Sequence, residues 1–349
     1  MAKITILGAG VTGMTIASQL PKDADVTILG EFLPGDPMDQ RYVSQWAGAI
    51  WLGVHDSTPR EQEMQLNSFS ELWRIAERHP ESGIRQIEMT EVMDIGDPAK
   101  VWYQGKVPGF RFLTPSELPP GAKWGTKFQT VVIRPPIFLP WYRKRLEQRG
   151  IKFKRTYVKA LRDLKGLGHD VLINATAFGS RNLLDVQEKR IVSMRQQNIR
   201  IRKEGYNRLY IRRGVDGYYS TAFARGDGTI YIGGIKNLGS HDFEPNLEHR
   251  SLIMRRQHEN QPEAFPSPDI KDYDFITDHV GVYPFIESQN GGVRVEKEIL
   301  HGQKVIHAYG QEAGGYTFSF GLAQQVSGYV QDFLREMPKP AEPGIPSKL

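Results

Sequence analysis

The first thirty residues alternate between short apolar runs and a stretch with helical spacing. Residues 4–7, ITIL, form a short and largely apolar run, which is typical of a parallel strand buried on both faces. Met14, Ile16 and Leu20 follow with the spacing of a buried helix stripe. Residues 25–29, DVTIL, predict a second strand. The pattern therefore predicts a strand–helix–strand unit at the start of the chain.

A second unit of this kind lies near the other end. In KVIHAYGQEAGGYTFSFGLAQQVSGYVQDFL, residues 306–309 predict a strand, and residues 321–334 carry a helical stripe after a glycine-rich turn. Between the two units, residues 58–79 predict an amphipathic helix whose apolar face lies toward a core. A strand-to-helix junction near each end indicates one domain assembled from both ends of the chain, with a second domain inserted between them.

The turn after the first predicted strand reads GAGVTG, residues 8–13. In this strand–turn–helix context, Gly8 permits a tight turn, Gly10 lets the backbone approach a pyrophosphate, and Gly13 lets helix and strand pack closely. The start of the helix offers free N–H groups and a positive dipole end to the phosphates. The motif therefore predicts a dinucleotide-binding site.

Glu31 stands about twenty residues further on, at the end of the second predicted strand, where its carboxylate can accept hydrogen bonds from ribose hydroxyls. A nicotinamide-dependent dehydrogenase would usually continue with further strand–helix units. Residues 30–51 are instead turn-rich, with small residues around two tryptophans, which suits a backbone laid along an extended flavin cofactor. This favours FAD, and a nicotinamide-dependent dehydrogenase stays as an alternative.

We therefore predict an α/β fold in which a discontinuous Rossmann-type FAD-binding domain carries an inserted substrate domain built on a large mixed or antiparallel β-sheet. The expected bounds are residues 1–55, 135–190 and 284–336 for the FAD-binding domain, residues 56–134 and 191–283 for the substrate domain, and residues 337–349 for a flexible tail.

Composition narrows the range of partners and cofactor links that we expect for this protein. The 45 basic and 40 acidic residues are scattered and leave a mild net charge of +5, so we expect no nucleic-acid partner. No apolar run is long enough to span a membrane, and we expect no membrane partner. The chain has no cysteine, which excludes a covalent cysteinyl link to the cofactor. The nine histidines show no ligand spacing, so we expect no metal site.

The chain ends in Ser347-Lys348-Leu349, after the proline-rich run MPKPAEPGIP. A terminal SKL is an address read by the peroxisomal import receptor. The preceding prolines favour an extended, mobile segment that the receptor can reach. The sequence thus predicts a peroxisomal location.

The whole chain resembles the D-amino acid oxidases, FAD-dependent enzymes of the amine and amino acid oxidase class. The resemblance is carried by GAGVTG, SQWAGAIW, DVLINATAFGSRNL, GTIYIGGIK, GVYPFIESQNGGVRVEKE, HAYGQEAGGYTFSFG and the terminal SKL. It implies non-covalent FAD, O2 as electron acceptor and release of hydrogen peroxide, which is best made beside catalase. The resemblance implies the following FAD-site residues: Gly8, Gly10, Val11, Thr12, Gly13, Glu31, Ser44, Ala47, Gly48, Ala49, Val158, Ala175, Thr176, Gly314, Gly315, Tyr316 and Thr317.

The substrate half departs from that family. Its carboxylate-binding arginine lies in a GxRP stretch, and Tyr283 holds that position here. Thr221 takes the place of a family tyrosine, for which Tyr218 or Tyr219 just upstream can compensate. We expect Tyr218, Tyr219, Thr221 and Tyr283 to line the substrate pocket. Lys236 and Arg225 are the candidate cations for a carboxylate.

The expected function is oxidative deamination of a D-amino acid or related (R)-amine, giving an imine that hydrolyses to a keto acid or ketone and ammonia. Three alternatives stay open beside the nicotinamide dehydrogenase. These are an amine oxidase with little D-amino acid activity, an engineered variant with altered selectivity, and a catalytically inactive homologue. The expected partners are the small-molecule substrate, O2 and the import receptor, with a homodimer as a further possibility.

Overall fold

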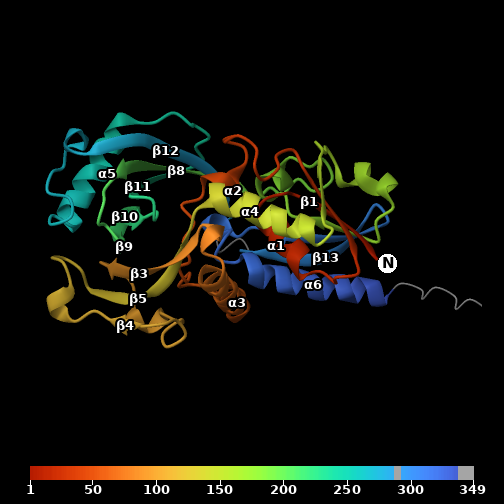
Figure 1. The fold of residues 1–349 in the computed structure, drawn as a ribbon, viewed down its shortest axis with the longest axis horizontal. Helices are drawn as coiled ribbons and strands as arrows, with labels where there is room; N and C mark the ends of the chain where they lie inside the picture. The colour runs from red at the N-terminus through yellow and green to blue at the C-terminus, as the bar shows by residue number, and fades with distance from the viewer. Residues whose placement is uncertain (287–291, 337–349) are drawn as a thin grey trace, which may run out of the picture.

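The computed structural model describes residues 1–286 and 292–336, so the predicted tail and its SKL address lie outside the described residues. Two β-sheets occupy the two halves of the elongated molecule (Figure 1). Helices α2 and α4 lie between the halves in this view. This arrangement confirms the predicted α/β fold class with two sheets.

The first sheet has six strands in the order β13-β14-β7-β1-β2-β6. Its five strands from β14 to β6 run parallel, and β13 pairs antiparallel at the edge. The strands are β1 (Lys3–Leu7), β2 (Asp25–Gly30), β6 (Lys152–Arg155), β7 (Val171–Asn174), β13 (Arg294–Leu300) and β14 (Gln303–Tyr309). The two strand–helix units predicted near the ends of the chain therefore meet in one sheet.

The second sheet has eight strands in the order β12-β8-β11-β10-β9-β3-β5-β4. All neighbours pair antiparallel except β3 and β9, so the sheet is mixed, as predicted. The strands are β3 (Ile84–Met93), β4 (Arg111–Phe112), β5 (Trp124–Ile133), β8 (Val192–Arg202), β9 (Arg208–Arg213), β10 (Tyr219–Ala224), β11 (Thr229–Leu238) and β12 (Asp274–Phe285).

Helices cover the first sheet and join it to the second. α1 packs against α6, and α3 contacts both α6 and the β3–β5 pair. Thr58 caps α3 with a reciprocal Thr–Glu capping box, which explains why this helix begins where the sequence predicts. The helices are α1 (Val11–Gln19), α2 (Val43–Trp46), α3 (Pro59–Arg78), α4 (Pro135–Gln148), α5 (Leu247–Asn260) and α6 (Ser319–Arg335).

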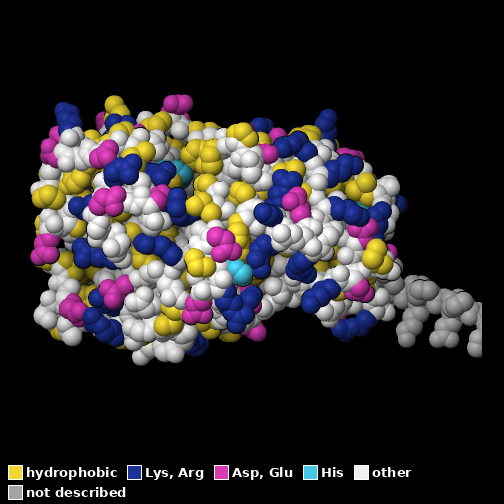
Figure 2. Space-filling model, in the orientation of Figure 1, with side chains coloured by type: hydrophobic (Ala, Val, Ile, Leu, Met, Phe, Trp, Pro, Cys, Tyr) yellow, Lys and Arg dark blue, Asp and Glu magenta, His cyan; other side chains and the backbone are white. Residues whose placement is uncertain are grey.

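The strands of each sheet fall close to the bounds expected for the two domains, although β12 runs two residues past residue 283. Helix α3 was assigned to the substrate domain, yet it also packs on α6. The domain bounds themselves stay a prediction. Lys and Arg side chains are interspersed with Asp and Glu over the face shown in Figure 2. None of the described helices is long and apolar enough to cross a membrane.

Candidate active site

The glycines of the GAGVTG turn hold strand and helix in close contact. A Cβ atom on Gly13 would lie 1.9 Å from the carbonyl oxygen of Gly8, and one on Gly8 would lie 2.2 Å from that of Ala175. Gly8 also has a φ of +118°, which only glycine adopts readily. These two positions therefore have room for hydrogen alone, and they bring the ends of β1 and β7 to the start of α1.

The start of α1 offers backbone N–H groups without a capping side chain of its own. Its N-cap is Gly10, which has no side chain, and its first turn carries no acidic residue. The Val11 N–H donates to Ser44 Oγ at 3.1 Å, which brings the segment around α2 to this helix start. Free N–H groups and a positive dipole end suit a pyrophosphate.

The late glycine-rich loop reaches the same place. Gln311 donates to the Thr12 hydroxyl at 3.3 Å, and a Cβ on Gly315 would lie 3.9 Å from Val11 Cγ1. The Tyr316 hydroxyl donates to the Ser44 carbonyl at 2.9 Å, while Thr317 faces the Ile50 carbonyl at 3.4 Å. A Cβ on Gly314 would meet the Phe318 ring. Segments far apart in sequence thus converge at the start of α1.

The remaining predicted FAD residues lie in other segments. Glu31 directly follows β2, and its exposed carboxylate pairs with Arg41 at 2.9 Å. Thr176 bonds to Asn174 beside the end of β7, and Val158 packs near Leu29 and Leu161. Ala47 and Gly48 follow α2. Ala47 is half-buried, and a Cβ on Gly48 would lie 3.1 Å from the Phe223 ring.

Ala49 has a φ of +54°, an uncommon conformation for a residue with a side chain. Backbone held in this region is found disproportionately at functional sites. Together with the uncapped, glycine-lined start of α1, this geometry fits a dinucleotide with a flavin end. The residues that would hold FAD lie in four converging segments, which are residues 8–13, 44–49, 175–176 and 314–317.

One face of the second sheet presents two cations on a single tyrosine ring. Register pairs Tyr219 on β10 with Arg213 on β9, and the Arg213 guanidinium lies 5.6 Å from the Tyr219 ring centroid. Lys236 on β11 places its Nζ 4.5 Å from the same centroid. Cations are attracted to the face of an aromatic ring, so Tyr219 supports both.

Lys236 lies near Arg213 on the same sheet and near Glu312 on the late glycine-rich loop. Its side chain is open to solvent, yet burial by the surrounding protein and the nearby Arg213 charge lower its pKa to about 8. Glu312 opposes this shift, and its own pKa is raised to about 7 by burial and by Glu61. Lys236 and Glu312 therefore lie near enough for each charge to affect the pKa of the other.

Tyr283 and Thr221 belong to the same group. Burial raises the pKa of Tyr283, and the neighbouring Tyr219 and Glu312 add to the shift. Thr221 is buried and donates to the Tyr210 carbonyl at 3.0 Å. Tyr219 thus lies near both Thr221 and Tyr283, and their role as a pocket lining stays a prediction.

Tyr218 and Arg225 lie elsewhere. Tyr218 accepts a hydrogen bond from Asn260 at 2.8 Å and stacks against Arg256, so it faces α5 and not Lys236. Arg225 is buried, donates to the Gly48 carbonyl and lies over the Tyr231 ring. Of the two candidate cations, only Lys236 lies beside Tyr219.

Sequence reasoning missed Arg213 and the group that fixes it. The Arg213 Nε donates to the fully buried Glu91 at 3.0 Å, and the Tyr103 hydroxyl donates to the other Glu91 oxygen at 3.1 Å. His55 lies 3.5 Å from that oxygen. Alternation along RLYIRR could have placed Arg213 on the Ile211 face, but only sheet register shows that this face carries Tyr219.

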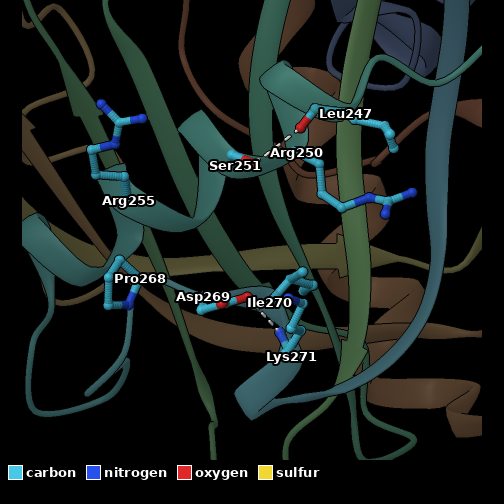
Figure 3. Close-up of a pocket in the computed structure, with 8 residues that line it drawn as sticks. All are labelled: Leu247, Arg250, Ser251, Arg255, Pro268, Asp269, Ile270 and Lys271. Carbon is cyan, nitrogen blue, oxygen red and sulfur yellow. Dashed lines mark hydrogen bonds between the residues drawn. The ribbon is translucent and has the colours of Figure 1, made fainter.

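A surface depression of about 460 Å³ lies between α5 and the 3-10 helix η7 (Ile270–Asp272). Figure 3 shows Arg250 and Leu247 on the α5 side, with Asp269 and Lys271 opposite. None of the predicted FAD or substrate residues lines it. No group of His, Asp and Glu suited to a metal ion occurs within residues 1–286 and 292–336.

Comparison with known proteins agrees with this geometry. The chain is 30% identical to a D-amino-acid oxidase of Fusarium vanettenii, over 93% of this chain and 95% of that protein. It is also 30% identical to a D-aspartate oxidase of Talaromyces thermophilus, over 94% and 95%. Glycine oxidase from Bacillus cereus ATCC 14579 shares the fold, with a TM-score of 0.72 at 13% identity over 95% of each chain.

An FAD-bound L-alpha-glycerophosphate oxidase from Mycoplasma pneumoniae has the same fold, with a TM-score of 0.68 at 14% identity over 95% of each chain. The family described as DAO, FAD dependent oxidoreductase, matches residues 3–328. That match favours FAD over the nicotinamide-dependent alternative. The chain belongs to this family of FAD-dependent oxidoreductases.

Proposed function

We propose that this protein is an oxidase that oxidatively deaminates a D-amino acid, whose carboxylate is bound by Lys236 with help from Arg213. The substrate loses a hydride equivalent from Cα and a proton from nitrogen, and water hydrolyses the imine to a keto acid and ammonia. When bound, FAD supplies the two-electron acceptor and passes the electrons to O2, giving hydrogen peroxide.

The observation that carries this proposal is the lack of a paired carboxylate for Lys236. No acidic oxygen within the described residues lies within 4 Å of its Nζ. Glu91 already binds Arg213, so it leaves Lys236 as the free cation of the pair. Two cations on one tyrosine ring repel each other, and a bound anion relieves that repulsion. A substrate carboxylate is such an anion.

The chain's own residues then position the substrate. Lys236 binds the carboxylate, and Arg213, held by Glu91, adds a second positive charge. Tyr219 fixes both cations through its ring. Tyr283 and Thr221 lie beside Tyr219 and would contact the rest of the substrate.

A second candidate substrate is an amine without a carboxylate. It is favoured by Tyr283, a neutral phenol at the position where the resembling family has arginine. It is also favoured by Glu312, which is ionised above its pKa of about 7 and can then offset the charge of Lys236. A peroxide-coupled screen of D-amino acids against matched (R)-amines separates the two. Turnover of D-amino acids alone supports the proposal, whereas turnover of amines alone overturns it. No peroxide from either class favours an inactive homologue.

Carboxylate binding should weaken with rising pH. Lys236 is charged below its pKa of about 8 and neutral above it, and Glu312 gains a negative charge above about 7. We expect the inhibition constant of propionate, which stays ionised throughout, to rise up to about tenfold per pH unit above 8. Measurements on the holoenzyme from pH 6 to 10 test this. In Glu312→Gln the change near pH 7 should disappear, and a flat profile in the parent protein would contradict the assignment of Lys236.

FAD should be held without a covalent bond, because the chain has no cysteine and the site is built from backbone groups and small side chains. Denaturing the purified protein should release all flavin into the supernatant. Colour that stays with the precipitated protein would contradict this expectation.

The peroxisome is the proposed location, on the strength of the C-terminal SKL and the expected peroxide product. A fluorescent cargo carrying residues 337–349 should co-localise with catalase. The same cargo without residues 347–349 should stay in the cytosol and serves as the control. Cytosolic signal from both cargoes would argue against the address.

A further inference from the structure

Four arginines gather around one carboxylate on the side of the second sheet that faces α4. They are Arg85 on β3, Arg134 at the N-cap of α4, Arg200 on β8 and Arg225 after β10, and we call them the arginine cluster. Asp227 lies in the turn between β10 and β11, at their centre. The members come from four segments far apart in sequence, so only the fold brings them together.

Asp227 has little capacity left for further arginines. Its Oδ2 accepts from Arg134 at 2.7 Å and from Arg200 at 3.3 Å. Its Oδ1 accepts from the Thr229 backbone at 3.1 Å and hydroxyl at 2.6 Å. The carboxylate is therefore engaged on both oxygens.

Arg85 and Arg225 have no carboxylate within 4 Å among residues 1–286 and 292–336. The Arg85 Nε is buried and has no hydrogen-bond partner. A Cβ on Gly226 would lie 3.0 Å from Arg85 Cδ, so the Arg85 side chain lies directly against the turn that carries Asp227. A buried donor without a partner costs free energy unless a ligand satisfies it.

Arg225 is 5% exposed, and within the described part of the chain its side chain donates to the Gly48 carbonyl alone. Burial, and then the charge of Arg134, lower its pKa to about 10 despite its contact with Tyr231. Burial and Arg134 also lower the pKa of Arg85. Nearby His279 adds no further positive charge at neutral pH, since burial lowers its pKa to about 4.

The cluster thus carries four positive charges and one negative charge in a partly buried place. Its charges repel one another, and one Nε is left without an acceptor. Guanidinium groups bind tetrahedral oxyanions through paired N–H donors, more strongly than single-point contacts do. The cluster is also separate from Tyr219 and Lys236, because Arg225 faces the Gly48 carbonyl.

We propose that the arginine cluster binds a doubly charged oxyanion, as inorganic phosphate or a phosphate monoester. The anion would join the second sheet, through Arg85 and Arg200, to the start of α4, through Arg134. Binding there stabilises the folded protein, because the site exists only when these segments are assembled.

The test is thermal unfolding of the FAD-loaded protein in phosphate against chloride at equal ionic strength and pH. We expect 10–50 mM inorganic phosphate to raise the Tm by about 2–4 °C over chloride. Glycerol phosphate forms the second arm. An equal or larger rise with the monoester identifies ester phosphate as the fitting source, and a rise with inorganic phosphate alone identifies the free anion. No difference from chloride in either arm overturns the proposal.

Arg85→Gln locates the site. This variant removes one repelling charge, so its Tm in chloride should equal or exceed that of the parent, while the phosphate increment should vanish. Arg162→Gln, at an exposed residue outside the cluster, should keep the full increment. A full increment in Arg85→Gln overturns the assignment. If Arg85→Gln does not fold, Arg200→Gln replaces it, because the Arg200 side chain is about one-third exposed. The phosphate increment should vanish in that variant too, and a full increment overturns the assignment.

Discussion

Gly10→Val is expected to leave the protein without bound FAD. A Cβ at this position would lie 2.8 Å from Ser44 Oγ, and the added methyl groups would occupy the space in front of the α1 N–H groups. Gly10 has an ordinary φ of −76°, so valine does not strain the backbone. The expected loss is at least about 100-fold in FAD affinity, or about 2.7 kcal/mol. Flavin absorbance per mole of protein measures it.

The matched control is Gly166→Val. Gly166 has open space around its hypothetical Cβ and no positive φ, so this variant should keep FAD and activity. The far-ultraviolet circular dichroism of both variants should match that of the parent, because neither glycine needs a special backbone conformation. Full FAD content in Gly10→Val would show that the start of α1 does not hold the cofactor.

The cofactor half could be predicted because its chemistry is local. A glycine-rich turn has to follow a buried strand and open a helix, so one short segment shows strand, turn and helix together. The predicted strand at residues 4–7 and the one at residues 306–309 both lie in the first sheet. Even the wide separation of the two units in sequence carried information, since it indicated a domain built from both ends.

The substrate half could be predicted only in part, because its chemistry depends on sheet register. Tyr218 and Tyr219 are neighbours and equally aromatic, yet Tyr218 ends the turn before β10, while Tyr219 is the first residue of that strand. Tyr219 contacts Arg213 and Lys236, while Tyr218 contacts α5. The sequence alone does not indicate which tyrosine faces Lys236. It also does not show that β9 pairs with β10 so that Arg213 lies opposite Tyr219.

The two cations suggested by sequence illustrate the same limit. Arg225 and Lys236 are both basic residues in or after strands of one hairpin, and residue type alone ranks the arginine higher for a carboxylate. The fold assigns them to different places. Arg225 supports the Gly48 carbonyl, and Lys236 lies over Tyr219 with Glu312 nearby. Charge in a sequence therefore predicts a need for counterions, while their identity follows from packing.

Lys236→Met is expected to separate carboxylate binding from the rest of catalysis. Methionine keeps an unbranched apolar stem of similar length over the Tyr219 ring but removes the charge. The kcat/KM for the best D-amino acid should fall roughly 30- to 150-fold, equivalent to about 2–3 kcal/mol for a charged hydrogen bond. The value for the matched amine without a carboxylate should change less than about threefold, because that substrate never used the ammonium. Steady-state peroxide assays on both substrates measure the difference.

Two controls make this comparison decisive. Lys22→Met, at an exposed residue, should behave as the parent with both substrates. Lys236→Arg should retain most D-amino acid activity, since it restores a cation at the same place, although its fork differs in geometry from an ammonium. FAD content should be equal in all three variants, because Lys236 lies on the second sheet and not among the segments that converge on α1. A parallel loss with both substrates in Lys236→Met would mean that the residue supports the pocket without binding a carboxylate. Arg213, fixed by Glu91 on the same face, would then be the remaining cation to bind it.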